Sequence, residues 1–372
     1  MHSYNKFSAV LLAAFLAFFA CLGLLLPDDT FSAAERRQLA EKPVLSRANL
    51  VSGRFGEAAE KYLADHFPLR ELWLRLKTAV EKACGKKEQH DVYFGRDGYL
   101  LQKANGADTE ILAANLAALN EFARATEAEC YFLLAPVSMQ VYADKLPPYA
   151  PNELEGLPAA VKKGLAREVT LIDPLPLFLA KKGEGLFYRT DHHWTTRGAY
   201  YAYVAAGEAL GYQGLAPSAF RKEVAATGFY GTLAARSGRR DVAPDRIELW
   251  LPATAPKVEV EYVQAGKVAD GFYALDRLET FDQYAVFLDG DHPQVIIRTD
   301  GVPGRRLLVV KDSFANSLLP FLALHFAEIH VLDLRYYHRP VSAYLQENKI
   351  AEVLFLYNSL TVTGERVLQK LS

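Results

Sequence analysis

Two short segments of this chain carry the side chains of an activated serine nucleophile. Asp191 and His193 stand two residues apart in one segment, and Ser313 lies shortly after the apolar run 307–310 in the other. A serine hydroxyl is a weak nucleophile until a neighbouring base takes its proton, and that base needs an orienting carboxylate. Because such triads are defined by geometry rather than by chain order, the order Asp, His, Ser is permitted. The three residues therefore predict acyl chemistry on a hydroxyl group.

The spacing of Asp191 and His193 assigns a role to each ring nitrogen. Two residues apart in a loop, the carboxylate can reach Nδ1, which leaves Nε2 free to face Ser313. In an extended segment His192 points elsewhere, so we interpret it as a candidate substrate residue. A metal cluster made of Asp191, His192 and His193 is the alternative. No further histidine or acidic pair stands at ligand spacing nearby, so we expect no metal.

Three further polar residues stand at or near the ends of predicted strands. Asn358 could donate an amide hydrogen bond to an oxyanion or could cap a turn, and Tyr357 beside it is another candidate for contacting substrate or oxyanion. Arg335 could orient a substrate or pair with Asp333. Ser313 itself has a simpler interpretation, because serine is a common helix cap. The sequence leaves these alternatives open.

Alternating strands and helices must position these residues. Strands are predicted at 130–136, 166–174, 306–310, 328–333 and 353–357, and helices at 107–126, from Thr195 or Thr196 to Leu210, and at 341–348. Another helix is expected after Ser313, capped by Ser317 and ending near Phe326. This alternation predicts a parallel sheet with helices on both faces. Ser313 then lies at the carboxyl edge of the sheet, where open α/β sheets bind ligands.

Two regions lack this alternation. Residues 28–90 carry apolar residues at three- and four-residue spacings, which predicts a helical lead-in. Residues 215–300 contain the alternating segment 258–263 and several loops, which we interpret as an antiparallel, β-rich insertion. The expected organisation is an N-terminal membrane segment at 1–27, the lead-in at 28–90 and a main domain at 91–372.

The N-terminal segment has the length and composition of a membrane anchor. Residues 7–26 are uncharged, and twenty helical residues span roughly 30 Å, the thickness of the bilayer core. Lys6 precedes this run and acidic residues follow it, so residues 28–372 should face the periplasm or the cell surface. A cleaved signal peptide is the alternative.

The net charge bears on the class of partner that the chain can bind, and the cysteines bear on a possible disulfide. The net charge is −2 and no long run of Lys or Arg occurs, which argues against nucleic acid. Cys84 and Cys130 could pair in an oxidising compartment, but their spacing does not show that they do.

Several short motifs together resemble a known family. The segment Asp191-His192-His193-Trp194 gives the DHHW protein family its name, and that family is similar to the periplasmic alginate O-acetyltransferases with an SGNH-hydrolase-like domain. Other matching pieces occur in order within residues 35–370, namely Phe67-Pro68-Leu69-Arg70, Gly95-Arg96-Asp97-Gly98-Tyr99-Leu100, Tyr142-Ala143-Asp144-Lys145-Leu146-Pro147, Asp312-Ser313-Phe314-Ala315-Asn316 and Asp333-Leu334-Arg335-Tyr336.

This resemblance implies a fold and an activity. The fold is a three-layer α/β/α sandwich in which the Asp-x-His pair precedes the serine, a permuted order relative to ordinary SGNH esterases. Asp191, His193 and Ser313 match the family's triad by position. Lys311 stands where the alginate enzymes usually carry Gly, which puts that glycine's contribution to the oxyanion hole in doubt.

The resemblance also implies a division of labour. A membrane-bound O-acyltransferase supplies the acetyl group, and the anchored protein transfers it, without a cofactor, to a hydroxyl of an exopolysaccharide or cell-wall glycan. An acetylesterase with the same triad and a non-catalytic glycan-binding or assembly protein are the alternatives.

Overall fold

The computed structural model describes residues 2–32, 35, 37–104, 108–239, 241–254, 256–300 and 304–371. The chain divides into two compact units, residues 1–86 and 87–372. The first unit holds the helices α1 (His2–Leu25), α2 (Arg47–Val51), α3 (Arg54–Asp65) and α4 (Arg70–Ala83), and the short strand pair β1 (Phe31–Ser32) and β2 (Arg37–Gln38).

Helix α1 is the one helix in the described part of the chain that is long and apolar enough to cross a membrane. Its window Lys6–Leu25 has a mean hydropathy of 2.5, and its side chains are exposed apart from a few, of which Phe19 is buried. The helix is therefore a candidate anchor or signal segment.

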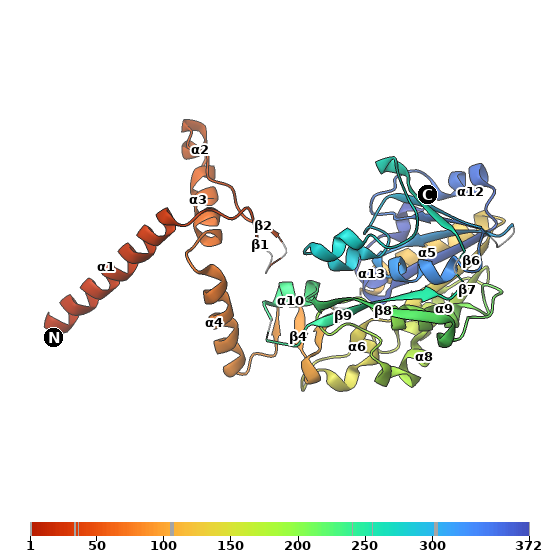
Figure 1. Ribbon diagram of the computed structural model, residues 1–372, viewed down its shortest axis with the longest axis horizontal. Coiled ribbons are helices and arrows are strands. Elements are labelled where there is room, and N and C mark those ends of the chain that lie inside the picture. Colours follow the sequence, from red (N-terminus) through yellow and green to blue (C-terminus); the bar gives the residue numbers. More distant parts are fainter. Residues whose placement is uncertain are drawn as a thin grey trace. The chain divides into compact units, whose positions relative to one another are not determined.

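The second unit is built on an eight-stranded sheet (Figure 1). Five neighbouring strands are parallel, in the order β14 (Glu328–Leu332), β13 (Arg306–Lys311), β15 (Glu352–Asn358), β6 (Glu129–Ala135) and β7 (Val169–Ile172). Their short, continuously apolar sequences are typical of strands that are buried on both faces. The predicted α/β class with a largely parallel sheet is confirmed.

The strands of the region 215–300 pair antiparallel, and three of them belong to the main sheet. Strands β12 (Gln294–Thr299), β10 (Val258–Tyr262) and β11 (Lys267–Ala269) extend the main sheet beyond β14 by antiparallel pairing. Only β8 (Phe220–Phe229) and β9 (Asp245–Pro252) form a sheet of their own. Apolar–polar alternation tells which side of a strand is buried, but it does not tell which strand lies next to it.

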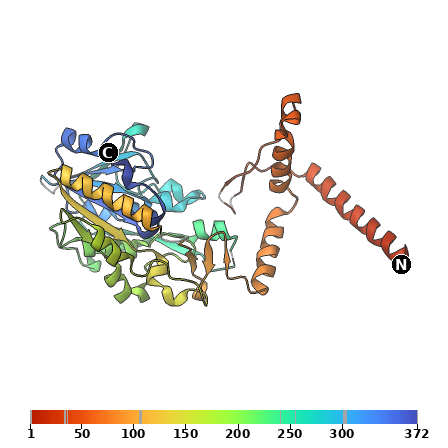
Figure 2. The same ribbon diagram turned by 180° about the vertical axis from the view of Figure 1, so that it is seen from behind.

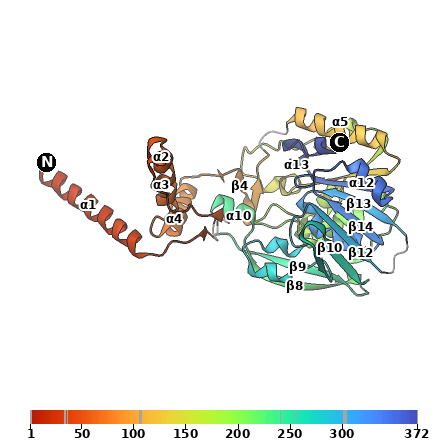
Figure 3. The ribbon, with the colours of Figure 1, turned by 90° about the horizontal axis from the view of Figure 1, so that it is seen from above.

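Helices cover the sheet in two groups. In the first group, α5 (Thr109–Ala125) crosses one face of the sheet (Figure 2). There the Phe122 ring meets the Phe355 ring of β15 at 5.5 Å. Helices α7 (Leu157–Gly164) and α13 (Ser359–Gly364) contact α5, and Figure 3 shows α13 beside it. In the second group, α9 (Thr196–Ala206) packs against α8 (Leu175–Ala180) and α11 (Leu319–Leu322).

The remaining elements of this unit are short. They are the strands β3 (Glu88–Gln89), β4 (Val92–Phe94) and β5 (Leu100–Gln102), and the helices α6 (Ser138–Val141), α10 (Thr232–Ser237) and α12 (Val341–Asn348). Helix α10 packs against the small sheet made by β3, β4 and β5.

Two helix ends depart from the expected positions. Thr195 caps α9, as predicted, by accepting from the Gly198 N–H, but the helix ends at Ala206 rather than at Leu210. After Ser313 the chain forms a 3-10 turn, Ser313–Ser317, and then the short helix α11. Ser317 does not cap α11, because its Oγ accepts a hydrogen bond from the buried Trp194 indole N–H.

Candidate active site

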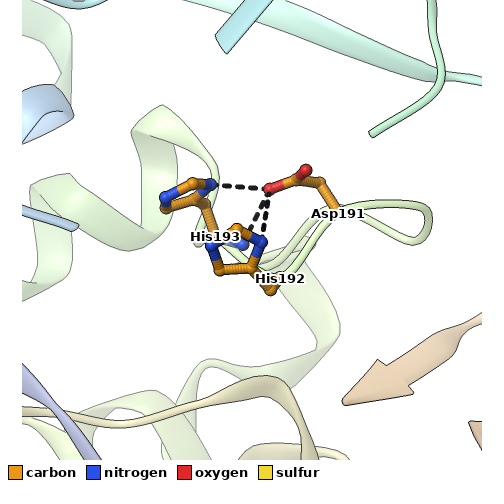
Figure 4. Close-up of side chains that lie close together, drawn as sticks. All are labelled: Asp191, His192 and His193. Carbon is orange, nitrogen blue, oxygen red and sulfur yellow. Dashed lines mark hydrogen bonds and ion pairs between the residues drawn. The ribbon is translucent and has the colours of Figure 1, made fainter. Parts of the chain in front are cut away.

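Asp191, His193 and Ser313 form one hydrogen-bonded line at the carboxyl edge of the sheet. Ser313 begins the 3-10 turn that follows β13, and the other two residues lie in the loop before α9. His193 Nε2 is 2.8 Å from Ser313 Oγ. On the other side of the ring, His193 Nδ1 is 2.6 Å from Asp191 Oδ1, and Figure 4 shows these two side chains facing each other. The structure therefore brings together the three residues that the sequence singled out.

Asp191 is buried and fully hydrogen-bonded. Oδ1 also accepts from the backbone N–H of His193 at 3.0 Å, and Oδ2 accepts from the Thr232 N–H at the start of α10 at 2.7 Å. Burial disfavours the carboxylate, but the neighbouring His192 and His193 imidazoles and the hydrogen bonds from His193 and the Thr232 N–H outweigh it and hold the pKa of Asp191 well below its usual value. An ionised carboxylate can only accept, so it fixes the proton on Nδ1 and leaves Nε2 to accept from the Ser313 hydroxyl.

Aromatic side chains fix the imidazole of His193. Its ring stacks on Tyr284 with centroids 3.7 Å apart and an interplanar angle of 7°. The Tyr284 hydroxyl is 3.1 Å from Ser317 Oγ, and Ser317 Oγ accepts from Trp194 Nε1 at 2.9 Å. Tyr284 was not predicted as a site residue, because it lies in the 215–300 region, where no local motif points to the triad.

Gly231 leaves the space that the Asp191 carboxylate needs. A Cβ built at Gly231 would overlap Cβ and Oδ2 of Asp191. The neighbouring Gly228 has nothing within 4 Å of the same position. Gly231 is thus a second site residue that sequence reasoning missed.

His192 lies beside the triad, and its side chain is partly exposed to solvent. Its Nδ1 is 3.5 Å from Asp191 Oδ1, and its side chain is 27% exposed. The possible ligand atoms of Asp191, His192 and His193 lie within 4.8 Å of one another, so a metal cluster is geometrically conceivable. An ion on Oδ1 and Nδ1 would replace the proton that they share, and Nε2 of His193 is already paired with Ser313. The donor set therefore fits an acid–base triad better than a metal site.

A cavity of about 580 Å³ opens at Ser313. Its polar lining near the serine comes from His192, Thr232, Arg236, Arg335 and Asn358. Its volume lies within the range of small-ligand sites.

Asn358 and Tyr357 differ in their relation to this cavity. Asn358 caps α13 by accepting from the N–H groups of Leu360 and Thr361, and its amide nitrogen donates to Asp312 and Thr361. The capping alternative thus describes Asn358, whose amide hydrogens are both engaged. Tyr357 has no accessible surface and does not line the cavity, because neighbouring residues on a strand point to opposite faces. Tyr357 is therefore not a substrate contact in this structure.

A buried ionic network lies behind the nucleophile. The Lys311 ammonium is fully buried and lies 2.6 Å from Asp291, 2.8 Å from Asn316 Oδ1 and 3.6 Å from Asp333. Arg335 pairs with Asp333 at 2.6 Å and with Asp291 at 2.7 Å. Burial opposes ionisation of Asp291, but Lys311 and Arg335 outweigh it and lower its pKa. Arg335 therefore pairs with Asp333, as one alternative predicted, and it also lines the cavity.

Replacing Lys311 by Met is expected to lower the free energy of unfolding by about 3 kcal/mol, because removing one partner leaves uncompensated buried charge. Denaturant or thermal unfolding of the two proteins in the same detergent measures the difference. Lys162→Met, at an exposed position of α7, is the matched control and should have little effect. A Lys311→Met protein as stable as the wild type would show that the network needs no ammonium.

Comparison with known proteins confirms the resemblance to the DHHW family. Residues 160–332 match the sequence model of that family, described as DHHW protein.

Two curated relatives are each named probable alginate O-acetylase AlgJ. The Pseudomonas putida protein is 26% identical over 194 residues, which are 49% of this chain and 50% of that protein. The Pseudomonas syringae pv. tomato protein is 27% identical over 203 residues, which are 51% of this chain and 50% of that protein. The chain thus spans about half the length of the curated relatives it matches.

Solved structures share the fold. A DHHW family protein from Eubacterium siraeum matches with a TM-score of 0.66 and 24% identity, over 76% of this chain and 95% of that one. Bacillus cereus PatB1 with a sulfonyl adduct matches with a TM-score of 0.63 and 24% identity, over 73% of this chain and 96% of that one.

Proposed function

We propose that this chain, in which residues 160–332 carry the DHHW match, is an SGNH-hydrolase-like O-acetyltransferase. It moves an acetyl group through an acyl-serine to a hydroxyl of an exopolysaccharide or cell-wall glycan. The observation that carries the proposal is the line Asp191–His193–Ser313 at the mouth of a sugar-sized cavity. The names of the curated relatives, probable alginate O-acetylases, support the choice of acetyl group and of polysaccharide.

In the first half-reaction Ser313 takes the acetyl group. His193 Nε2 removes the hydroxyl proton while Oγ attacks the acetyl carbonyl, and Asp191 stabilises the imidazolium that forms. Within the described residues no acceptor is paired with the backbone N–H of Ser313, so we assign this donor to the developing oxyanion. The bond to the donor's leaving group then breaks, and that group takes the proton from His193.

In the second half-reaction a sugar hydroxyl replaces the leaving group. His193 removes its proton, the sugar oxygen attacks the acetyl-serine carbonyl, and the proton returns to Ser313 Oγ as the ester bond to the enzyme breaks. His192 and Arg335 line the cavity near Ser313 and are assigned to holding the acceptor sugar.

The N-terminal helix supports a location outside the cytoplasm. In this proposal α1 anchors the chain by a single pass, Lys6 stays inside, and the second unit faces the periplasm or the cell surface. A membrane-bound O-acyltransferase supplies the acetyl group in the same membrane.

Partition of the acetyl group between glycan and water tests this function. The full-length protein in detergent is incubated with an activated acetyl ester, with and without a de-acetylated polysaccharide such as alginate or a peptidoglycan fragment. A transferase yields ester-linked acetyl on the polymer and less free acetate when a suitable acceptor is present. Acetate release that no acceptor changes would instead indicate an esterase, and a folded protein without turnover would indicate a binding or assembly protein.

Gly231→Ala is expected to lower ester turnover by about 10²-fold, because the added Cβ displaces the Asp191 carboxylate that orients His193. Gly228→Ala adds the same methyl group where nothing lies within 4 Å and should keep wild-type turnover. Initial rates and unfolding temperatures of both variants make the comparison. If a folded Gly231→Ala protein turned over ester as fast as the wild type, the close approach of Gly231 to Asp191 would have no role in turnover.

A further inference from the structure

Helix α4 of the first unit presents an apolar stripe that no described residue of that unit covers. Leu69 just before the helix, and Leu72, Leu76 and Val80 within it, are each about half exposed. At 3.6 residues per turn these positions fall on one face. A stripe of this length on a helix indicates that something outside the first unit packs against it.

The charges around this stripe favour an anionic surface. Residues 70–86 contain five Lys or Arg and two Glu, a net charge of +3, whereas the whole chain carries −2. Arg75 and Lys77 lie on the two flanks of the stripe, and Glu71 and Glu81 lie farther round the helix, with Glu71 3.9 Å from Arg75. Cations beside an apolar face and acids farther round are the arrangement of helices that lie on bilayers.

Contacts within the first unit set the start of α4 beside the apolar helix α1. The Phe19 ring of α1 stacks on Phe67 with centroids 5.3 Å apart and meets Trp73 of α4 at 5.9 Å. Gly23 of α1 lies against the Pro68 ring. Phe19 precedes the end of the apolar run by seven residues, or about 10 Å. If α1 spans a bilayer, Phe67 and Trp73 therefore reach about 10 Å into the outer half of its acyl region, which is the depth to which an interfacial helix buries its apolar face.

We propose that α4 lies in the outer surface of the membrane that α1 enters, with Leu72, Leu76 and Val80 among the acyl chains and Arg75 and Lys77 among anionic headgroups. This inference rests on the membrane anchoring in the proposed function. It adds a second membrane contact, so that residues 28–86 of the first unit hold the chain at the lipid surface.

Fluorophores on single cysteines test the depth of α4. Three full-length proteins are reconstituted into phosphatidylcholine vesicles with about one quarter phosphatidylglycerol and a nitroxide-labelled lipid. One keeps the native Cys21 of α1 and carries Cys84→Ser and Cys130→Ala. The other two add Cys21→Ser together with Leu76→Cys on the stripe or Glu71→Cys farther round the helix.

The expected result is quenching at residue 76 that approaches the quenching at Cys21 and exceeds that at residue 71 by about twofold or more. Omitting phosphatidylglycerol should reduce the quenching at residue 76. Quenching at Cys21 alone would overturn the proposal while leaving the anchor intact, and would turn the stripe into a protein-docking surface. Equal quenching at residues 71 and 76 would overturn the surface position. No quenching at Cys21 would overturn the anchor and this proposal together, without bearing on the triad.

Discussion

Ser313→Ala is expected to lower turnover of an activated acetyl ester by at least about 10⁴-fold, because the remaining imidazole and carboxylate have no nucleophile to activate. The substitution removes one oxygen from a partly buried position, so the folded protein should persist. Initial rates with a chromogenic acetyl ester, together with the unfolding temperature, measure both effects.

The control for this variant is a serine outside the site. Ser342→Ala, at an exposed position of α12, should leave turnover unchanged. Ester turnover in the Ser313→Ala protein above one-tenth of the wild-type rate would remove the serine from the mechanism.

Asp191→Asn is expected to lower the same turnover by about 10³- to 10⁴-fold, although the side chain keeps its size. An amide placed at 2.6 Å from Nδ1 can donate to that nitrogen, which favours the tautomer with its proton on Nε2. A protonated Nε2 cannot take the proton of Ser313.

The double variant separates this role from a structural one. If Asp191 acts only through His193 and Ser313, then Asp191→Asn in the Ser313→Ala background should cost almost nothing more. A further loss as large as that of the single Asp191→Asn variant would show that the carboxylate acts outside the triad.

The triad could be predicted because its parts carry local signals. Asp191 and His193 lie in one short loop, and Ser313 follows a strand whose apolar run is plain in the sequence. Parallel strands place their carboxyl ends at one edge, so the loops after different strands meet there. Local pattern and topology together were enough to bring the three residues together.

The residues that pack around the triad could not be predicted in the same way. Tyr284, Gly231 and Asp291 come from the region 215–300 and reach the site through packing between distant segments. A tyrosine that stacks on an imidazole has the same sequence signature as any buried tyrosine. Lys311 was conspicuous as a departure from the family's glycine, but its buried partners depend on where Asp291 and Asp333 lie in three dimensions.

In the fold, too, some features follow from local sequence patterns and others depend on segments that are distant in the sequence. The five parallel strands were evident from short apolar runs, whereas the pairing of β12 with β14 was not, because a strand's alternation does not name its neighbour. Likewise Ser317 stands where the sequence predicts a helix cap. Its Oγ instead accepts a hydrogen bond from the buried Trp194 indole N–H.

The formation of an acetyl-enzyme at Ser313 is the central claim, and intact-mass spectrometry tests it most directly. The full-length protein in detergent is incubated with an activated acetyl ester, quenched in acid and digested for peptide mapping, in parallel with Ser313→Ala. We predict a gain of one acetyl group in the wild type, mapped to Ser313 and absent from the variant. An adduct on another residue, an equal adduct in Ser313→Ala, or neither adduct nor turnover in a folded protein would contradict it.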